Sequence, residues 1–455
     1  MAAVTVDQEQ WAEENFGECQ LGDARRTRRA VKVACQMAEF PDGSTPCQTE
    51  NLADLKAVYR LFDCDEATFP ALAEPHWKLT RSRARGTVLV IGDTMETDFG
   101  IHREIDGLGP TGDGFGLGFL LHNSMMVDAD SSEIIGIAAQ ELFYRQPAPN
   151  GENSYQLKQR ARESEVWGRV IDDIGQPAEG TKYIHVFDRG ADNLEVFCHL
   201  LQQKSDWVIR AAQLHRTVFD AAGQQTDLCQ LLDAQPCLGT YDLKVRVAKR
   251  RSSRTAHMEV RAVQATIRKP KRMTPWLKSV EFTEMTQWVV EAREVNPPKG
   301  TTALRWVLWT SLPSASFAAA WQAIEYYEKR WLIEEYHKAI KTGCRLESRQ
   351  YQSAARLEAV TGIISVLAVR LLQMKILART EPNLPAEKVV PKQWLKMLRA
   401  LRKRSQIETV EDFFRHLAGL GGFLMRKRDG DPGWITIWKG TQKLTLAIRG
   451  HLAMR

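Results

Sequence analysis

The sequence predicts a mixed α/β protein with helical regions at both ends and a β-rich insertion in its core. Apolar residues recur at helical spacing between Trp11 and Ala38, and again between Ala318 and Ala378. Short apolar runs that end in an aspartate occupy the middle of the chain. Segments of alternating polarity follow between 212 and 312.

The composition is that of a globular protein and excludes a disordered, collagen-like or coiled-coil chain. The 455 residues are 44% hydrophobic and 26% charged, and this length suggests about three domains. The 62 Lys and Arg against 56 Asp and Glu give a net charge of +6, which alone identifies no partner. The eight cysteines lack metal or disulfide spacing, so we expect reduced thiols in a cytoplasmic protein. Met1–Gln10 does not resemble a signal peptide, and the apolar run Ile363–Val369 predicts a buried helix and no membrane partner.

The N-terminal region is predicted to be helical and to contact phosphate. Asp23 is a plausible N-cap, so the basic residues after it fall in the first turns of a helix. These residues are Arg25, Arg26, Arg28, Arg29 and Lys32. A basic helix N-terminus suits phosphate contact, although a solvated basic face would give the same pattern.

The next region, 85–211, reads as α/β. Val88–Ile91 and Tyr183–Phe187 are predicted buried strands, followed by Asp93 and Asp188 respectively. Phe119–Val127 and Ile134–Phe143 are predicted to form a hairpin with a turn at 128–132. Helices near 157–172 and 193–203 and a strand at Trp207–Arg210 complete the region.

Antiparallel strands are predicted in the insertion, at Tyr241–Val247, His257–Ile267, Gln287–Glu294 and Arg305–Trp309. From Leu243 to Val280 the insertion contains twelve Lys or Arg against one acid, Glu259, so we expect it to face an anion. Helices are predicted at Ala318–Lys341, Ala355–Ala378 and 392–404, with a short helical pattern at the C-terminus. The helix at 392–404 is also basic.

Polar residues form a stripe along the predicted helix Ala318–Lys341. On an ideal helix, Tyr327, Arg330, Glu334 and Lys341 fall within a wedge of roughly 60°, and Lys338 adjoins them. A solvent-exposed face of salt bridges would also give such a stripe. The tyrosine and the flanking Trp331 are less expected on such a face.

Three carboxylates are candidates for a metal site. Asp93 and Asp188 follow apolar strands, and Glu334 lies on the striped helix. Each aspartate alone could be an ordinary turn or cap residue, but carboxylates that converge repel one another unless cations hold them. Two Mg²⁺ ions would suit these oxygen ligands and would activate a water or a 3′-hydroxyl. Arg330 and Lys341 could then hold phosphates, and Tyr327 could hydrogen-bond a backbone oxygen of DNA.

The order Tyr327-x2-Arg330-x3-Glu334-x6-Lys341 is identical to a signature of bacterial DDE transposases of the insertion-sequence-four family, which the chain resembles. Further matches follow in the same order: Leu21-Gly22-Asp23, Asp93-Thr94, Asp188-Arg189, Val208-x-Arg210, Asn296-Pro297-Pro298-Lys299-Gly300 and Val369-Arg370-Leu371-Leu372-Gln373.

The resemblance implies a ribonuclease-H-like catalytic core (71–378) interrupted by the β-rich insertion at about 212–312. It also implies a helical domain at 1–70 that binds transposon ends and a helical dimerisation domain at 379–455. Asp93, Asp188 and Glu334 match the catalytic triad, which binds two Mg²⁺ ions, for which Mn²⁺ can substitute.

The implied reaction is cut-and-paste DNA transposition by a homodimer on paired ends, in the bacterial cytoplasm. Water frees a 3′-hydroxyl, this hydroxyl forms a hairpin that water reopens, and the 3′-end then joins target DNA. A base flips out at the bent DNA end, and by resemblance Trp306 and Trp331 are its stacking candidates, with core packing as the alternative. The resemblance also proposes DNA contacts by Arg189, Arg210, Lys299 and Lys338.

Two other functions remain open at this point: a catalytically silent inhibitor that binds transposon ends, and a ribonuclease-H-fold endonuclease without strand transfer. The intact triad and N-terminal basic region disfavour the first alternative. The polar stripe and the two tryptophans disfavour the second. Glu96, Asp98 and Asp192 are further carboxylates close to the triad residues in sequence.

Overall fold

The computed structural model divides the chain into two compact units. The residues described are 7–100, 102–103, 105–145, 151, 153, 162–245, 253–271, 273–403, 405–426 and 429–454. The first unit comprises Met1–Ala84, Thr94–Gln146 and Ile333–Arg455. The second unit comprises Arg85–Asp93 and Pro147–Leu332.

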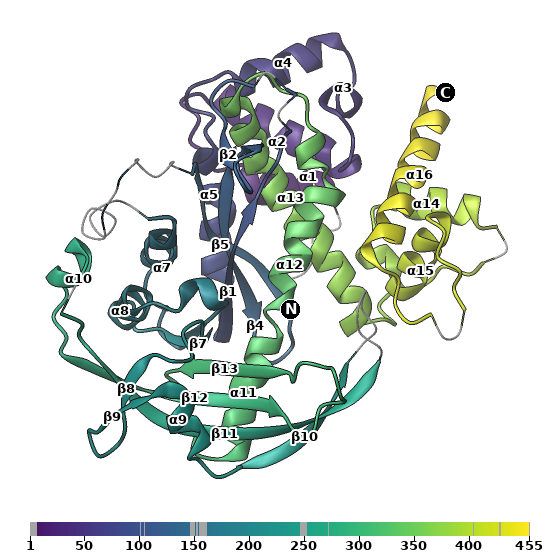
Figure 1. Ribbon diagram of the computed structural model, residues 1–455. Coiled ribbons are helices and arrows are strands. Elements are labelled where there is room, and N and C mark those ends of the chain that lie inside the picture. Colours follow the sequence, from purple (N-terminus) through teal and green to yellow (C-terminus); the bar gives the residue numbers. More distant parts are fainter. Residues whose placement is uncertain are drawn as a thin grey trace. The chain divides into compact units, whose positions relative to one another are not determined.

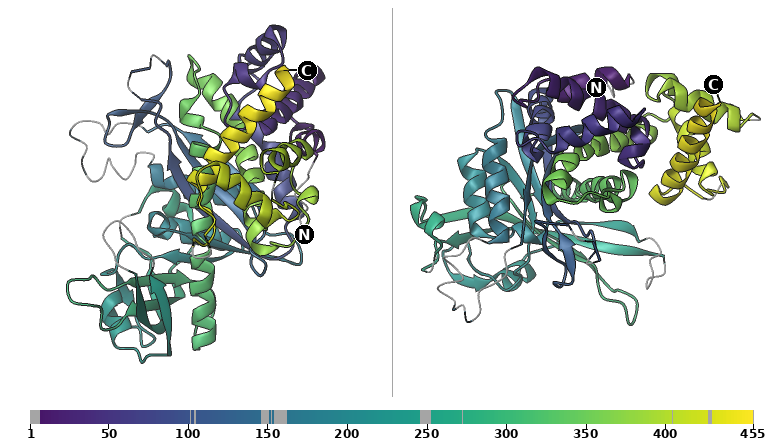
Figure 2. Two further views of the ribbon diagram at one scale, coloured as in Figure 1. Left: turned by 90° about the vertical axis from the view of Figure 1, so that its right-hand side faces the viewer. Right: turned by 90° about the horizontal axis from the view of Figure 1, so that it is seen from above.

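In the first unit, N-terminal helices pack around one long apolar helix. They are α1 (Gln8–Phe16), α2 (Ala24–Glu39), α3 (Thr45–Gln48), α4 (Leu52–Phe62) and α5 (Phe69–Arg83), and the long helix is α13 (Ala354–Thr380). Figure 2 shows α13, in green, among the purple N-terminal helices. Helix α13 is long and apolar enough to cross a membrane, but its most apolar window is 89% buried. The expectation of a buried helix at Ile363–Val369 is confirmed.

Two β-hairpins also belong to the first unit. The larger consists of β4 (Leu120–Asp128) and β5 (Ile134–Phe143), and the smaller of β2 (Gly109–Thr111) and β3 (Gly116–Gly118). The turn of the larger hairpin is closed by Asp128, whose Oδ1 accepts from the Ser131 N–H at 2.7 Å. The hairpin predicted from the polar residues at 128–132 is therefore confirmed.

A large mixed sheet organises the second unit (Figure 1). Its strands follow the order β1-β6-β7-β13-β12-β11-β8-β9, and β10 also pairs with β11. The pairs β1–β6 and β6–β7 are parallel, whereas β7–β13 and the pairs of the insertion are antiparallel. The strands are β1 (Gly86–Glu96, whose last three residues belong to the first unit), β6 (Thr181–Phe187), β7 (Asp206–Arg210), β8 (Thr217–Phe219), β9 (Gln225–Asp227), β10 (Gly239–Val245), β11 (Arg254–Arg268), β12 (Glu284–Glu294) and β13 (Arg305–Thr310). Antiparallel strands in the insertion were correctly predicted.

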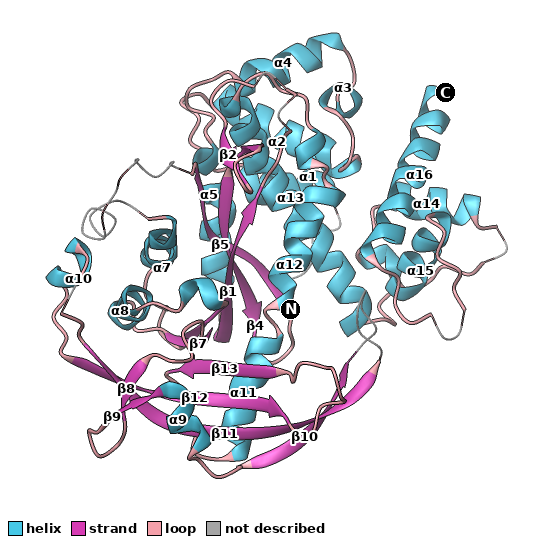
Figure 3. Ribbon diagram, viewed as in Figure 1, coloured by secondary structure: helices cyan, strands magenta, loops and turns pink. Residues whose placement is uncertain are grey.

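Helices flank this sheet. They are α7 (Val166–Ile174), α8 (Leu194–Gln202), α9 (Leu228–Asp233), α10 (Pro275–Ser279) and α11 (Phe317–Glu328). Helix α11 crosses β11, β12 and β13 and also contacts β6 and β7 (Figure 3). Positions 157–161 of the helix predicted at 157–172 lie outside the described residues. With its sheet and its helices at both ends of the chain, the mixed α/β class is confirmed.

The single helix predicted at Ala318–Lys341 is wrong, because the helix is interrupted. After α11, the Lys329 and Arg330 N–H groups donate to Tyr326 and Tyr327 three residues back, at 3.2 and 3.0 Å. Helix α12 (Trp331–Lys338) follows and passes into a π-helical turn, Ala339–Gly343. Tight i→i+3 bonds and a wide π turn each change the angle between successive residues. The stripe calculated for an ideal helix therefore does not run unbroken from Tyr327 to Lys341.

The C-terminal region is helical, as predicted, with α14 (Lys392–Leu401), α15 (Val410–Leu420) and α16 (Trp434–Ala453). Helix α14 confirms the basic helix expected at 392–404, apart from its last turn. Helices α15 and α16 approach closely because Gly440 lacks a side chain, since a Cβ there would meet the Leu417 carbonyl. All eight cysteines are free, in agreement with the expectation of reduced thiols.

We predict that stability falls as the pH drops from 7.5 to 5.5, because two histidines are buried as neutral side chains. Burial lowers the pKa of both His76 and His185 from 6.5 to about 3. Between pH 6.5 and 3 the unfolded chain therefore binds protons that the folded chain does not. The free energy of unfolding consequently decreases as the pH is lowered through this window. Each histidine should contribute a loss of about 1.4 kcal/mol at pH 5.5.

Urea denaturation of a His185→Leu variant at both pH values measures one of these contributions. The His185 side chain in β6 is fully buried, and neither ring nitrogen has a hydrogen-bond partner in the described part of the chain. The variant should lose about 1.4 kcal/mol less stability than the wild type on acidification. His102→Leu, at an exposed side chain, is the control and should behave like the wild type. An unchanged pH dependence in His185→Leu would contradict the prediction.

Candidate active site

Parallel pairing of two strands sets the positions of two predicted triad residues. Ile91 of β1 pairs with Val186 of β6, and Asp93 and Asp188 each lie two residues further on. Asp188 directly follows β6 as predicted, whereas β1 continues through Asp93 to Glu96. Gly92 permits close packing here, since a Cβ would collide with the Phe187 ring. The shared register brings both carboxylates to the same end of the parallel strand pair.

Asp93 lies beside two signature residues of the second unit, Arg330 and Tyr327. Arg330 Nη1 is 3.5 Å from Asp93 Oδ2, and the two side chains are 19% and 22% exposed. The Arg330 guanidinium is 6.0 Å from the centre of the Tyr327 ring. Tyr327 in turn packs edge-on against Trp306, with 5.6 Å between ring centroids. The structure thus groups a carboxylate, a guanidinium and two aromatic rings.

Other predicted DNA contacts lie nearer the surface of the second unit. Trp331 begins α12 and is 40% exposed. Arg189 and Lys299 are exposed, the first in the 3₁₀ turn after Asp188 and the second in the turn after β12. Arg210 ends β7 and donates to the Arg305 carbonyl at 3.5 Å.

The third carboxylate, Glu334, lies in the first turn of α12 and belongs to the first unit. It lines a cavity of about 630 Å³ together with Lys338 and Lys341. Lys341 Nζ lies 3.1 Å from Glu347 Oε1, and Lys338 Nζ lies 3.0 Å from Glu335 Oε1. The structure therefore brings together three of the predicted residues at this cavity.

Three further carboxylates that lie close to the predicted triad residues in sequence form hydrogen bonds or ion pairs within the protein. Glu96 Oε1 accepts from the Gly112 N–H at 2.6 Å and pairs with Arg145 at 2.9 Å. Asp98 accepts from the Gly100 N–H at 2.8 Å. Asp192 pairs with Arg216 at 2.8 Å and also accepts two backbone N–H groups of the loop after β7. All three carboxylates therefore have structural partners of their own.

Comparison with known protein families finds matches to three stretches of the chain. A transposase DNA-binding family matches residues 8–67, a transposase DDE domain matches 154–372, and a transposase Tn5 dimerisation domain matches 366–455. The chain belongs to the Tn5-like DDE transposases. It is accordingly a DNA-cleaving and strand-transferring enzyme that binds DNA and forms dimers. Its mixed α/β fold is consistent with a ribonuclease-H-like core.

DDE transposases use divalent metal ions, and the candidate ligands of this transposase suit them. Asp93, Asp188 and Glu334 offer the carboxylate oxygens that hard cations prefer. Asp188 Oδ1 accepts from the Gly190 N–H at 2.8 Å, which fixes the carboxylate at the end of β6. Among the described residues, its second oxygen has no hydrogen-bond partner and remains available for a cation.

Three basic side chains in the described part of the insertion are paired with acids, and the expectation that the insertion faces an anion stays a prediction. Arg254, Arg261 and Arg268 of β11 form ion pairs with acids, mainly of the neighbouring strand β12. The partners are Glu294 for Arg254, Glu259 and Glu291 for Arg261, and Glu284 for Arg268. Strand register therefore neutralises charges that are distant in sequence. Positions 246, 249, 250, 251 and 272 of this basic stretch lie outside the described residues.

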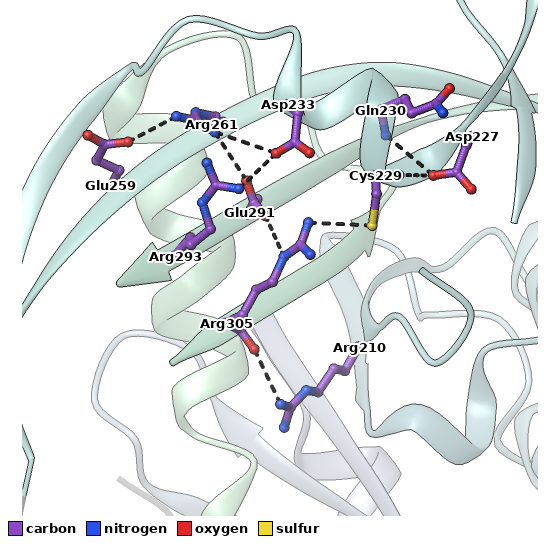
Figure 4. A network of polar contacts seen from close by, with 10 residues as sticks. All are labelled: Arg210, Asp227, Cys229, Gln230, Asp233, Glu259, Arg261, Glu291, Arg293 and Arg305. Atoms are coloured by element: carbon purple, nitrogen blue, oxygen red, sulfur yellow. Dashed lines mark hydrogen bonds and ion pairs between the residues drawn. The ribbon is translucent and has the colours of Figure 1, made fainter. Parts of the chain in front are cut away.

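Figure 4 shows the centre of this charge network in the transposase insertion. Glu291 is fully buried and accepts from Arg305 Nε at 2.6 Å. The Arg305 carbonyl accepts from Arg210, so the predicted DNA contact Arg210 is joined to the insertion. A buried carboxylate needs such partners because an isolated one would be strongly destabilising. The network fixes β13, the strand that contains Trp306.

The four predicted arginines of the N-terminal domain differ in their surroundings. Asp23 caps α2, and the Arg25 side chain holds the pKa of Asp23 at about 2 by hydrogen bonding. Arg25 is 82% exposed, and Arg28 is also exposed. Arg26 and Arg29 instead pair with Glu66 at 2.9 Å and Asp54 at 2.5 Å. Arg25 is itself paired with Asp23 at 2.7 Å, so the exposed Arg28 is the best suited of the four to phosphate contact.

Sequence reasoning missed two residues that line the Glu334 cavity, His337 and Phe115. His337 Nε2 lies 3.1 Å from Asn123 Nδ2, and its position three residues after Glu334 on α12 was a usable signal. Phe115 lies in a glycine-rich segment between β2 and β3, where no periodic pattern draws attention to one aromatic residue.

Proposed function

We propose that this transposase catalyses cut-and-paste transposition through a DNA hairpin, with Asp93, Asp188 and Glu334 as ligands of two Mg²⁺ ions. Such ions lower the pKa of a bound water or 3′-hydroxyl and stabilise the leaving oxygen. Arg330 and Lys341 hold phosphates beside the carboxylates, and Tyr327 hydrogen-bonds the DNA backbone. Each step is an in-line attack on a phosphate, so one set of residues serves all of them.

The observation that carries the proposal is the alignment of Asp93 with Asp188, with Arg330 3.5 Å from Asp93. An arginine beside a carboxylate is suited to a phosphate that approaches a metal ion held by the same carboxylate. The proposal requires the two units to bring Glu334 to these aspartates when DNA is bound.

Aromatic residues serve the hairpin step. Trp306, packed on Tyr327, is proposed to stack on a base that leaves the helix, and the exposed Trp331 is proposed to support the bent end. Stacking on an aromatic face offsets the cost of unpairing a base. Arg189, Arg210, Lys299 and Lys338 are proposed to contact the DNA backbone near this point.

The domains divide the remaining tasks. We assign end-repeat binding to 1–70, catalysis to 71–378 and dimerisation to 379–455. Two subunits pair two transposon ends and then engage target DNA, in the cytoplasm of a bacterium. Charge on α2, where Arg25 and Arg28 are exposed, supports the first assignment.

Incubation of the purified protein with Mg²⁺ and DNA that bears its native ends tests the proposal. Hairpin ends and joined products are expected. Bound but uncut DNA would instead support an end-binding inhibitor, and cleavage without hairpins or joining would support a simple endonuclease. Replacing Mg²⁺ by Mn²⁺ should preserve activity, whereas a chelator should abolish it.

We predict that Arg28→Ala weakens end binding and reduces its salt dependence. Loss of one phosphate contact should lower the slope of log K against log salt by about 0.9. Fluorescence anisotropy at several KCl concentrations measures this slope. Lys78→Ala is the matched control, since Lys78 is also exposed in the first unit but pairs with Glu74 along α5. A slope equal to that of the wild type would exclude Arg28 as a phosphate contact.

A further inference from the structure

An exposed phenylalanine stands at the rim of the cavity that contains Glu334. Phe115 is 78% exposed and lines this cavity of about 630 Å³ from the turn between β2 and β3. Single exposed apolar side chains are common on proteins, so exposure alone indicates no ligand. The way in which the turn holds Phe115 is more informative.

The turn is braced and depends on glycine. Glu96 Oε1 accepts from the Gly112 N–H at 2.6 Å, and Arg145 Nη1 joins the Glu96 carboxylate at 2.9 Å to the Gly112 carbonyl at 3.0 Å. Gly112 and Gly114 adopt φ angles of 61° and 96°, a region that other residues enter only with strain. The Gly114 N–H closes the turn on the Thr111 carbonyl at 3.0 Å. The chain thus presents Phe115 from a defined turn rather than from an open loop.

The cavity beside Phe115 offers groups for both parts of a nucleotide. Lys338 and Lys341 can contact phosphate, and the Phe115 ring offers a flat face for a base. Asp98 and Asp113 also line the cavity, so a small free anion would meet repulsion there. A base is neutral, and its phosphate could remain at the lysines. The volume lies within the range of roughly 300–1,000 Å³ that is typical of ligand sites.

The geometry points to Phe115 as a stacking platform for an unpaired base of the DNA strand that is cut at Glu334. This inference rests on the proposed function and adds a base site in the first unit, apart from Trp306 in the second. Removing an aromatic platform should slow the step that needs the unpaired base by roughly 5- to 150-fold.

Fluorescence of 2-aminopurine tests the contact without any chemistry. The probe is placed in turn at each base next to the cleavage position, on DNA ends that are already nicked, bound to Asp188→Asn protein with Mg²⁺. Phe115→Trp should quench the probe at one position, and Phe115→Ala should leave it bright there. If residue 115 changes the signal at no position, the inference is wrong. Because the signal is read before any hairpin forms, this outcome is distinct from a failure to form hairpins.

Kinetics on the catalytically intact protein provide a second test. Phe115→Ala should slow hairpin formation within the range above, and Phe115→Tyr should restore it, while end binding and first-strand nicking stay normal. Leu201→Ala, at another exposed apolar residue on α8, is the control and should match the wild type. Normal hairpin formation by Phe115→Ala, or a loss confined to end binding or to target joining, would overturn the assignment.

Discussion

Strand cleavage is expected to slow by roughly a thousandfold in each of three variants, Asp93→Asn, Asp188→Asn and Glu334→Gln. The reason is that the loss of one proposed metal ligand removes several kcal/mol of transition-state stabilisation. The fold should survive these changes. At position 188, the asparagine Oδ1 can still accept from the Gly190 N–H that now donates to Asp188 at 2.8 Å. DNA cleavage assays and end-binding assays on the same preparations separate lost chemistry from lost binding.

Two aspartate variants serve as controls for the triad. Asp98→Asn removes a carboxylate from the Glu334 cavity and should retain cleavage, since the amide can still cap Gly100. Asp192→Asn breaks a buried pair with Arg216 and should lower stability together with all activities. If a triad variant cleaves DNA like Asp98→Asn, that residue is not a metal ligand.

The sequence predicted those features that depend only on residues close together in the chain, such as buried strands and helix caps. The apolar runs before Asp93 and Asp188 predicted two buried strands, and both exist as β1 and β6. Asp23 was recognised as an N-cap because capping requires only a side-chain oxygen next to the first free N–H groups. The family signature supplied the candidate triad, which neither composition nor periodicity identifies alone.

Other features depend on contacts between distant residues and were therefore not predicted. The interruption between α11 and α12 changes hydrogen bonding over a few residues within a sequence whose spacing still suits one helix. Gly343 ends the π turn where a Cβ would strike Trp438, a contact with the C-terminal helix α16. The pairing of Arg261 with Glu291 follows from the register of β11 and β12. Counting charges along one segment cannot reveal such compensation.

A buried ion pair in the first unit joins the helix of Glu334 to the dimerisation region. Glu335 on α12 contacts Lys375 on α13, and the Trp434 indole N–H donates to the same carboxylate. Lys375 Nζ lies 3.7 Å from the centre of the Trp434 ring, and its side chain is only 4% exposed. Burial lowers the pKa of Lys375 to about 8 even though Glu335 favours its charged form. The ammonium therefore depends on its carboxylate partner.

Glu335→Gln is accordingly expected to destabilise the region around α13 by about 3 kcal/mol, because it leaves a buried ammonium without a counter-charge. Glu335→Gln combined with Lys375→Met should recover most of this loss, since neither buried charge remains. Hydrogen exchange of the α13 amides measures the opening free energy in each variant. Lys338→Gln is the control, because this lysine also pairs with Glu335 but is 54% exposed. Its replacement should lower the opening free energy by less than about 1 kcal/mol. Additive losses in the double variant would show that the two side chains are not coupled.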